Sequence, residues 1–107
     1  MPNTDYKSVT GQMSVLNDTV VLTVGGYGTV GFEIGGTFTG TVTFEGRVGG
    51  TWRALAVATL AVPGTFVTTT TAPGSWVGSA AGLTQVRMRF STATSGTVTG
   101  DITAAGV

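Results

Sequence analysis

The chain contains neither cysteine nor histidine. Without cysteine there can be no disulfide, no thiolate nucleophile and no Cys-type metal site. Without histidine there can be no Ser-His-Asp triad, no Cys-His pair and none of the common His-based metal sites. Composition therefore predicts a protein that is not an enzyme and carries no cofactor, and it points to binding or assembly.

Charge is also scarce, at 9% of the residues, whereas soluble domains commonly have about 25%. Five basic and five acidic side chains cancel, so no basic excess is available to hold a nucleic acid. Lys7 is the only lysine, and few charges remain to protect exposed strand edges from association. We interpret the surface as one covered by partners or by further copies of the chain, the alternative being a stable, Thr-coated monomer.

No run of about 20 apolar residues is present, so no membrane-spanning segment is expected. The N-terminal sequence MPNTDYKSVTGQMSV lacks the basic and then apolar layout of a secretory signal. A length of 107 residues suits one domain with one modest core. We therefore expect a single folded domain without a membrane partner.

Threonine, glycine and valine dominate, and the β-branched residues favour strands. Apolar and polar residues alternate with period two in four segments, as in half-buried strands. These segments are Thr29–Ile34, Thr39–Val48, Thr84–Thr92 and Thr97–Ala104, and the expected core residues in them are Val30, Phe32, Ile34, Val42, Phe44, Val48, Val86, Met88, Phe90, Val98, Ile102 and Ala104. Less regular strands are expected at Thr19–Val24, which is apolar on both faces like a central strand, and at Thr51–Leu60, Thr65–Thr71 and Ser75–Ala80.

Glycine and proline punctuate the sequence at short intervals, as turns do. The expected turns are Gly25–Gly28, Gly35-Gly36, Gly49-Gly50, Pro63-Gly64, Pro73-Gly74, Ala81-Gly82 and Ser95-Gly96. About eight strands separated in this way predict an all-β fold, an antiparallel β-sandwich of jelly-roll type. Residues 1–12 are polar and poorly patterned, so we expect an N-terminal arm there, or a frayed terminus, and a single sandwich domain over residues 13–107.

Two carboxylates, Glu33 and Glu45, fall on outward faces of neighbouring expected strands. A glycosidase would need two such groups facing each other across a cleft. Three arginines fall on the same kind of face, and cross-strand ion pairs with them are the favoured interpretation. These are Arg47, Arg87 and Arg89.

The other acidic residues, Asp5, Asp18 and Asp101, are scattered, so the sequence predicts no calcium site. The glycines of Gly25–Gly28 are not followed by Gly-Lys-Ser/Thr or by a helix, which argues against a phosphate-binding loop. No metal and no cofactor are therefore expected.

A binding site built from aromatic side chains is a third possibility, after paired carboxylates and a metal or phosphate site. If Trp52, Trp76 and Tyr27 were exposed together, they could stack on sugar rings or anchor a protein interface. Packing of both tryptophans at the ends of the sandwich is the favoured interpretation. The candidate partner contacts are those of the arm, together with the turn and strand-end residues: Tyr6, Lys7, Met13, Tyr27, Trp52, Arg53 and Trp76.

Residues 18–103 resemble small structural proteins of tailed bacteriophages. The resemblance is carried by NDTVVLTVGGYGTVGFEIGGTFTGTVTFEGRVGGTWRAL and by AAGLTQVRMRFSTATSGTVTGDI. Within these stretches the family pattern matches Tyr27–Gly31, Gly36–Gly46, Gly50–Leu55 and Ala81–Arg89.

The resemblance implies a jelly-roll or carbohydrate-module-like sandwich carried on the virion, and it supplies no catalytic residues. Such domains act as capsid decoration or cement proteins, as head fibres or as tail modules. A short chain without a fibre shaft favours decoration: a homotrimer on the capsid surface that binds the major capsid protein and copies of itself. The alternative is a glycan-binding, carbohydrate-module-like adhesion domain of a head fibre or tail component.

Overall fold

The computed structural model describes residues 6–62 and 64–106. These residues form nine strands and no helix, and so none of their segments is a helix able to cross a membrane. The strands are β1 (Tyr6–Met13), β2 (Thr19–Thr23), β3 (Thr29–Arg47), β4 (Arg53–Ala54), β5 (Val57–Thr59), β6 (Phe66–Val67), β7 (Thr69–Thr70), β8 (Gly74–Ser79) and β9 (Gln85–Ala105).

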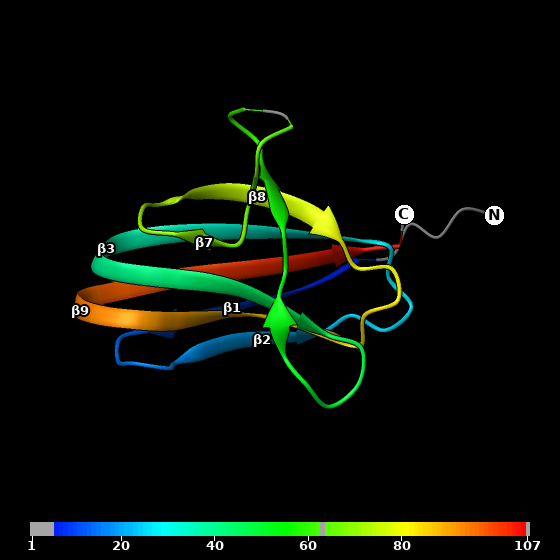
Figure 1. Cartoon of the computed structure of the whole chain (residues 1–107), viewed down its shortest axis with the longest axis horizontal. Coiled ribbons are helices and arrows are strands. Elements are labelled where there is room, and N and C mark those ends of the chain that lie inside the picture. The colour runs from blue at the N-terminus through cyan, green and yellow to red at the C-terminus, as the bar shows by residue number, and fades with distance from the viewer. Residues whose placement is uncertain (1–5, 63, 107) are drawn as a thin grey trace.

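Two long strands, β3 and β9, organise the molecule. They pair antiparallel along almost their whole length, and the pair folds back on itself at the left of Figure 1. The first half of β3 therefore pairs with the second half of β9, as at Phe32 and Ile102, and the remaining halves pair as at Phe44 and Met88. Because of this bend, the paired strands β3 and β9 form the centre of two facing sheets.

The first sheet has the order β1, second half of β9, first half of β3, β8, β5 and β6. The second sheet has the order β2, first half of β9 and second half of β3, with β4 and β7 on the outer edge of β3. Early and late strands thus alternate across both sheets, as in a jelly roll. The predicted antiparallel β-sandwich is confirmed.

Two expected turns are instead bends inside continuous strands. Gly35-Gly36 lies within β3, and Ser95-Gly96 lies within β9, so each pair of expected strands is a single strand. At the corner, Gly96 has a φ of +85°, and a Cβ atom there would lie 2.2 Å from the carbonyl oxygen of Thr37. Only glycine fits such a position. These glycines therefore mark a place where two paired strands bend together.

The core lies between the two sheets and is built from alternate residues of the strands. Phe44 is at its centre, with ring centroids 5.1 Å from Phe32 and 5.1 Å from Trp76. The inward residues predicted from the period-two pattern are buried, apart from Val48, which is 69% exposed. Val48 is exposed because β3 ends one residue earlier, at Arg47.

The arm expected over residues 1–12 is wrong from Tyr6 onward. Residues 6–13 form β1, which pairs with β9 from Tyr6 opposite Ala105 to Met13 opposite Val98. Met13 is fully buried. The polar residues of this segment lie on the outward face of β1, which is an edge strand. This is why the segment shows no clear apolar pattern. Residues 1–5 of the expected arm lie outside the described part of the chain.

The structure also differs from the prediction at two other expected strands. The segment Thr51–Leu60 is divided into β4 on the second sheet and β5 on the first, so the chain crosses between the sheets at Leu55. The segment Thr19–Val24 contains β2, which among the described strands pairs with β9 alone and is therefore an edge strand, with Val21 36% exposed. Local sequence indicated strands in both places, but the pairing partners were decided by the fold.

Candidate functional site

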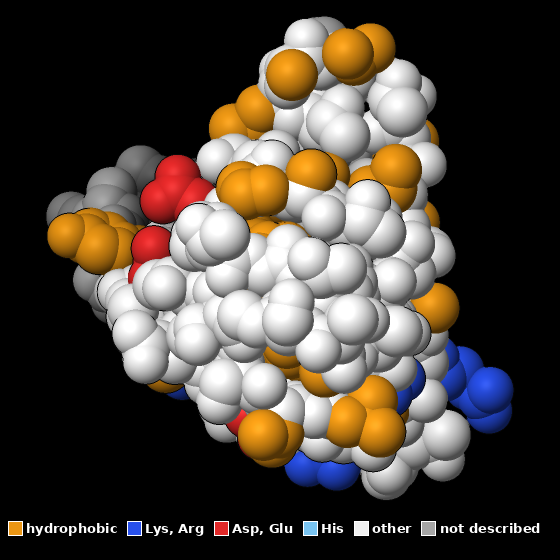
Figure 2. Space-filling model, turned by 90° about the vertical axis from the view of Figure 1, so that its left-hand side faces the viewer, with side chains coloured by type: hydrophobic (Ala, Val, Ile, Leu, Met, Phe, Trp, Pro, Cys, Tyr) orange, Lys and Arg blue, Asp and Glu red, His pale blue; other side chains and the backbone are white. Residues whose placement is uncertain are grey.

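A projecting hairpin carries three exposed apolar side chains close together in the sequence. It joins β5 to β6 and stands above the sheets in Figure 1, and Figure 2 shows hydrophobic side chains on the same projection. Leu60 and Val62 are each 58% exposed, and Phe66 is 66% exposed. Within the hairpin, the Thr59 hydroxyl donates a hydrogen bond to the Val62 carbonyl oxygen at 2.8 Å. No charged residue occurs between Arg53 and Arg87.

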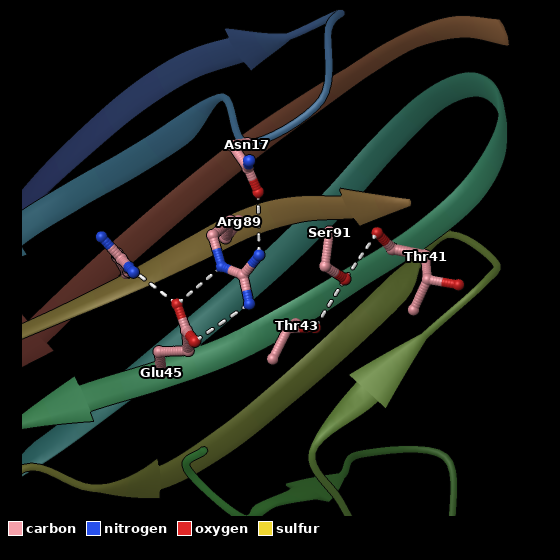
Figure 3. Close-up of polar contacts among 7 residues, drawn as sticks. Asn17, Thr41, Thr43, Glu45, Arg89 and Ser91 are labelled. Carbon is pink, nitrogen blue, oxygen red and sulfur yellow. Dashed lines mark hydrogen bonds and ion pairs between the residues drawn. The ribbon is translucent and has the colours of Figure 1, made fainter. Parts of the chain in front are cut away.

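The outer face of the second sheet carries a cluster of ionised groups (Figure 3). Arg87 lies directly opposite Glu45 across the β3–β9 ladder, and its Nε donates to Glu45 Oε1 at 2.7 Å. Arg89 Nε donates to the same oxygen at 3.1 Å, and Arg89 Nη2 donates to Oε2 at 3.3 Å. Arg89 Nη1 donates to Asn17 Oδ1 at 2.9 Å, which ties the β1–β2 turn to this face. The predicted cross-strand ion pairs are confirmed for Glu45.

Glu45 is 8% exposed. Burial raises the pKa of this carboxyl, but the hydrogen bonds and positive charges of Arg89 and Arg87 outweigh burial and hold the pKa below its ordinary value. Glu45 is therefore ionised in the folded protein at neutral pH. A charged carboxylate between two guanidinium groups is a structural arrangement, because both of its oxygens are already occupied by donors.

Trp52 packs on this cluster. The guanidinium carbon of Arg87 lies 4.2 Å from the centroid of the Trp52 ring, and that of Arg47 lies 4.8 Å away. Arg47 also donates a hydrogen bond to Gln85. Trp52 is thus held against two cations, and its ring covers the arginine side chains.

The outer face of the first sheet is hollowed into a groove. Its central part has a volume of about 380 Å³ and is lined by Glu33 and Asp101, with Ser75 beside them. Two further hollows share lining residues with it and extend it along β3, whose outward positions Gly31 and Gly35 leave the floor without side chains. We call this the sheet-one groove.

The sequence-predicted contacts do not form one site. Met13 and Trp76 are buried in the core and are therefore not available to a partner. Lys7 lies 5.6 Å from the centroid of the Tyr27 ring, and both side chains are half-buried. The remaining three candidates are Tyr6, exposed at the start of β1, Trp52, packed on arginines, and Arg53, exposed on β4.

The structure removes the geometric basis of two alternatives that the sequence had raised, a sugar-stacking platform and a pair of glycosidase carboxylates. A sugar platform needed Trp52, Trp76 and Tyr27 exposed together, and Trp76 is buried. A glycosidase pair needed Glu33 and Glu45 in one cleft, but they lie on the outer faces of different sheets. Among the residues that the structure describes, no three acidic side chains gather as a metal site would require.

Sequence reasoning missed the hairpin and the groove. The hairpin had a visible signal, since Leu60, Val62 and Phe66 surround an expected Pro-Gly turn in an uncharged stretch. The groove had none, because Glu33 and Asp101 are adjacent only through the pairing of β3 with β9.

Comparison with solved structures identifies the same fold elsewhere. The SPBc2 prophage-derived protein YomS superimposes with a TM-score of 0.78 at 18% identity, over 98% of this chain and 97% of YomS. The PBSX exported protein XepA superimposes with a TM-score of 0.76 at 21% identity, over 92% of this chain but only 38% of XepA. No protein-family model and no curated protein sequence matches the chain. At these identities the similarity concerns the fold.

Proposed function

We propose that this chain is a non-enzymatic structural protein of a phage virion, a capsid decoration or cement protein. In this proposal it sits on the capsid surface as a homotrimer, binding the major capsid protein and copies of itself. Three observations support it: the sequence resemblance to phage structural proteins, the shared fold of the prophage-derived protein YomS, and the exposed apolar hairpin. The hairpin is the observation that carries the proposal.

The hairpin suits a shell contact because of its shape and chemistry. Val62 and Phe66 project from the sandwich and are exposed, and burying apolar surface contributes roughly 25 cal/mol per Å². Contiguous exposed apolar side chains on a soluble domain commonly mark an interaction site. The absence of charge on the hairpin makes attachment by apolar burial the expected mode, with little dependence on salt.

A cement protein needs no energy source or cofactor. A protein that binds only the assembled shell stabilises that shell by mass action. The rigid sandwich would hold the hairpin in a fixed position, so little conformational entropy would be lost on attachment.

The double variant Val62→Ser/Phe66→Ser is expected to keep its fold and to bind shells lacking the protein about tenfold more weakly or worse. Both side chains are exposed, so the sandwich loses little packing. Binding is measured by co-sedimentation with the particles, and the fold by circular dichroism. The matched control is Val15→Ser/Leu16→Ser, which removes apolar groups of 59% and 58% exposure from another turn. Full occupancy by the hairpin variant would overturn the proposal.

A further inference from the structure

Most charged side chains on the described part of the chain lie in two regions. Glu33 and Asp101 lie on the outer face of the first sheet, in the sheet-one groove. All four arginines belong to the second sheet, three in β3 and β9 and one, Arg53, on the edge strand β4. Glu45 pairs with two of them, and Asp18 precedes β2 on the same sheet. Lys7, on β1 of the first sheet, packs against Tyr27. Figure 2 shows most of the visible acidic side-chain surface at upper left and most of the basic surface at the bottom and lower right.

The two carboxylates in the groove form an unfavourable pair. Glu33 is directly opposite Asp101 across the β3–β9 ladder. Residues in that relation have Cβ atoms about 4.5–5.5 Å apart, and like charges there are destabilising. Glu33 accepts a hydrogen bond from the Ser75 hydroxyl at 3.3 Å, but within residues 6–62 and 64–106 neither carboxylate has a cationic partner. The groove therefore favours a positively charged occupant.

The shape of the groove selects among cations. A calcium ion takes six to eight oxygen ligands, mostly carboxylates, and no third acidic side chain of the described chain joins these two. A sugar would stack on an exposed aromatic ring, but Trp76, the only tryptophan lining the groove, is buried in the core. A guanidinium group extended from a protein surface matches both the charge and the open shape.

A second copy of this chain offers such a group. Arg53 is exposed on β4, and in the described structure it has no acidic partner. Beside it lies Val48, 69% exposed, while Val77 on the groove wall is 44% exposed. Each region therefore combines charge with an exposed valine, and the charges are opposite.

We propose that the sheet-one groove of one copy receives the Arg53 edge of the next copy. The inference rests on the proposed function, since it names the surfaces through which copies of the assembly protein meet. The two surfaces differ, so the contact is heterologous, and an open chain keeps one free surface at each end until a ring closes. In the proposed homotrimer the third copy closes the ring.

Charge exchange tests the contact. In analytical ultracentrifugation of the full chain, Glu33→Lys/Asp101→Lys and Arg53→Glu are each expected to weaken self-association about tenfold or more. In an equal mixture each variant supplies the charge that the other now requires, so mixed pairs should form. A ring of three copies would keep one mismatched contact, so the mixture should recover dimers rather than closed trimers. Raising NaCl from about 50 to 500 mM should weaken association of the parent chain. A mixture that stays as dissociated as its components would overturn the proposal.

Filling the groove tests its shape. A Cβ atom at Gly35 would meet nothing within 4 Å, and one at Gly31 would come no closer than 3.8 Å to another atom. The variant Gly31→Thr/Gly35→Thr should therefore fold normally, and its self-association should be about tenfold weaker than that of the parent chain. The control is Gly25→Thr, which is equally open and lies outside the groove. Association of the filled variant equal to that of the parent would contradict the groove contact.

Two further measurements separate this inference from the proposed function. Shell binding by the filled variant reports on Val62 and Phe66 of the hairpin, which lie outside the groove, whereas Leu60 lines it. If the parent self-associates with the predicted charge behaviour but binds no shell, the groove contact stands and the cement role fails. If Ca²⁺ or a cello-oligosaccharide binds the parent, is lost in Gly31→Thr/Gly35→Thr, and leaves self-association unchanged, the groove is a ligand site and the inference is overturned.

Discussion

Gly96→Ala is expected to lower the free energy of unfolding by about 2–5 kcal/mol, because the added methyl group would overlap backbone atoms of the paired strand. The added Cβ would lie 2.2 Å from the Thr37 carbonyl oxygen and 2.6 Å from the Phe38 Cα, and φ at this residue is +85°. Both contacts are backbone atoms of the paired strand, so no side-chain rotation relieves them. Urea unfolding followed by tryptophan fluorescence measures the change.

Gly25→Ala serves as the control for Gly96→Ala. It adds the same methyl group where nothing lies within 4 Å, and its effect should stay within about 0.5 kcal/mol. An equally small loss at Gly96 would mean that the corner tolerates a side chain and that the bend does not depend on glycine. Gly40→Ala is a second test of the same corner, because a Cβ there would lie 2.1 Å from the Thr92 carbonyl oxygen.

Glu45→Gln is expected to destabilise the protein by about 2–3 kcal/mol at pH 7. The substitution leaves Arg87 and Arg89, whose side chains are only 20% and 28% exposed, without their shared carboxylate. Glu33→Gln is the control, because Glu33 forms no ion pair among the described residues, and its effect should stay within about 0.5 kcal/mol. Chemical unfolding of the three proteins gives the comparison.

The pH dependence of the Glu45 effect has a defined sign. The pKa of Glu45 is lower in the folded protein than its ordinary value of about 4.3, so the unfolded chain binds the proton more readily. The stabilisation is therefore fully present above about pH 5 and is lost as the pH falls through the folded-state pKa. The difference between the parent and Glu45→Gln should shrink between pH 5 and 3. A difference that is constant over this range would exclude the ion pair as its source.

The apolar–polar pattern within a single strand was sufficient to predict which of its residues face outward. Alternation placed Glu45, Arg87 and Arg89 on outer faces, and the structure joins these three in ion pairs. The same alternation placed Glu33 on an outer face but gave it an arginine partner, whereas the fold puts Asp101 opposite it. The difference arises because period two fixes the side of a sheet on which a residue lies, and strand order fixes its neighbours.

The aromatic residues illustrate the same limit. Trp76 falls in the expected strand Ser75–Ala80, and its favoured packing in the sandwich agrees with its burial, but only the pairing of β8 with β3 places it beside Phe32 on the inner face. Trp52 lies between two strands, and only the approach of β9 to β3 brings Arg87 onto its ring. Pairing over more than 25 residues of separation is outside the reach of local patterns.

The sequence alone determined that the chain forms strands, which of their faces are apolar, and that cysteine and histidine chemistry is excluded, because these follow from residue type and period. Tertiary structure decided that Gly36 and Gly96 bend long strands rather than end short ones, that Tyr6–Met13 is a sheet edge rather than an arm, and that Glu33 faces Asp101 on one sheet while Glu45 pairs with arginines on the other. The physical reason is that a glycine permits a turn and a bend equally. Which one forms depends on whether a distant strand bends beside it and continues the hydrogen bonds.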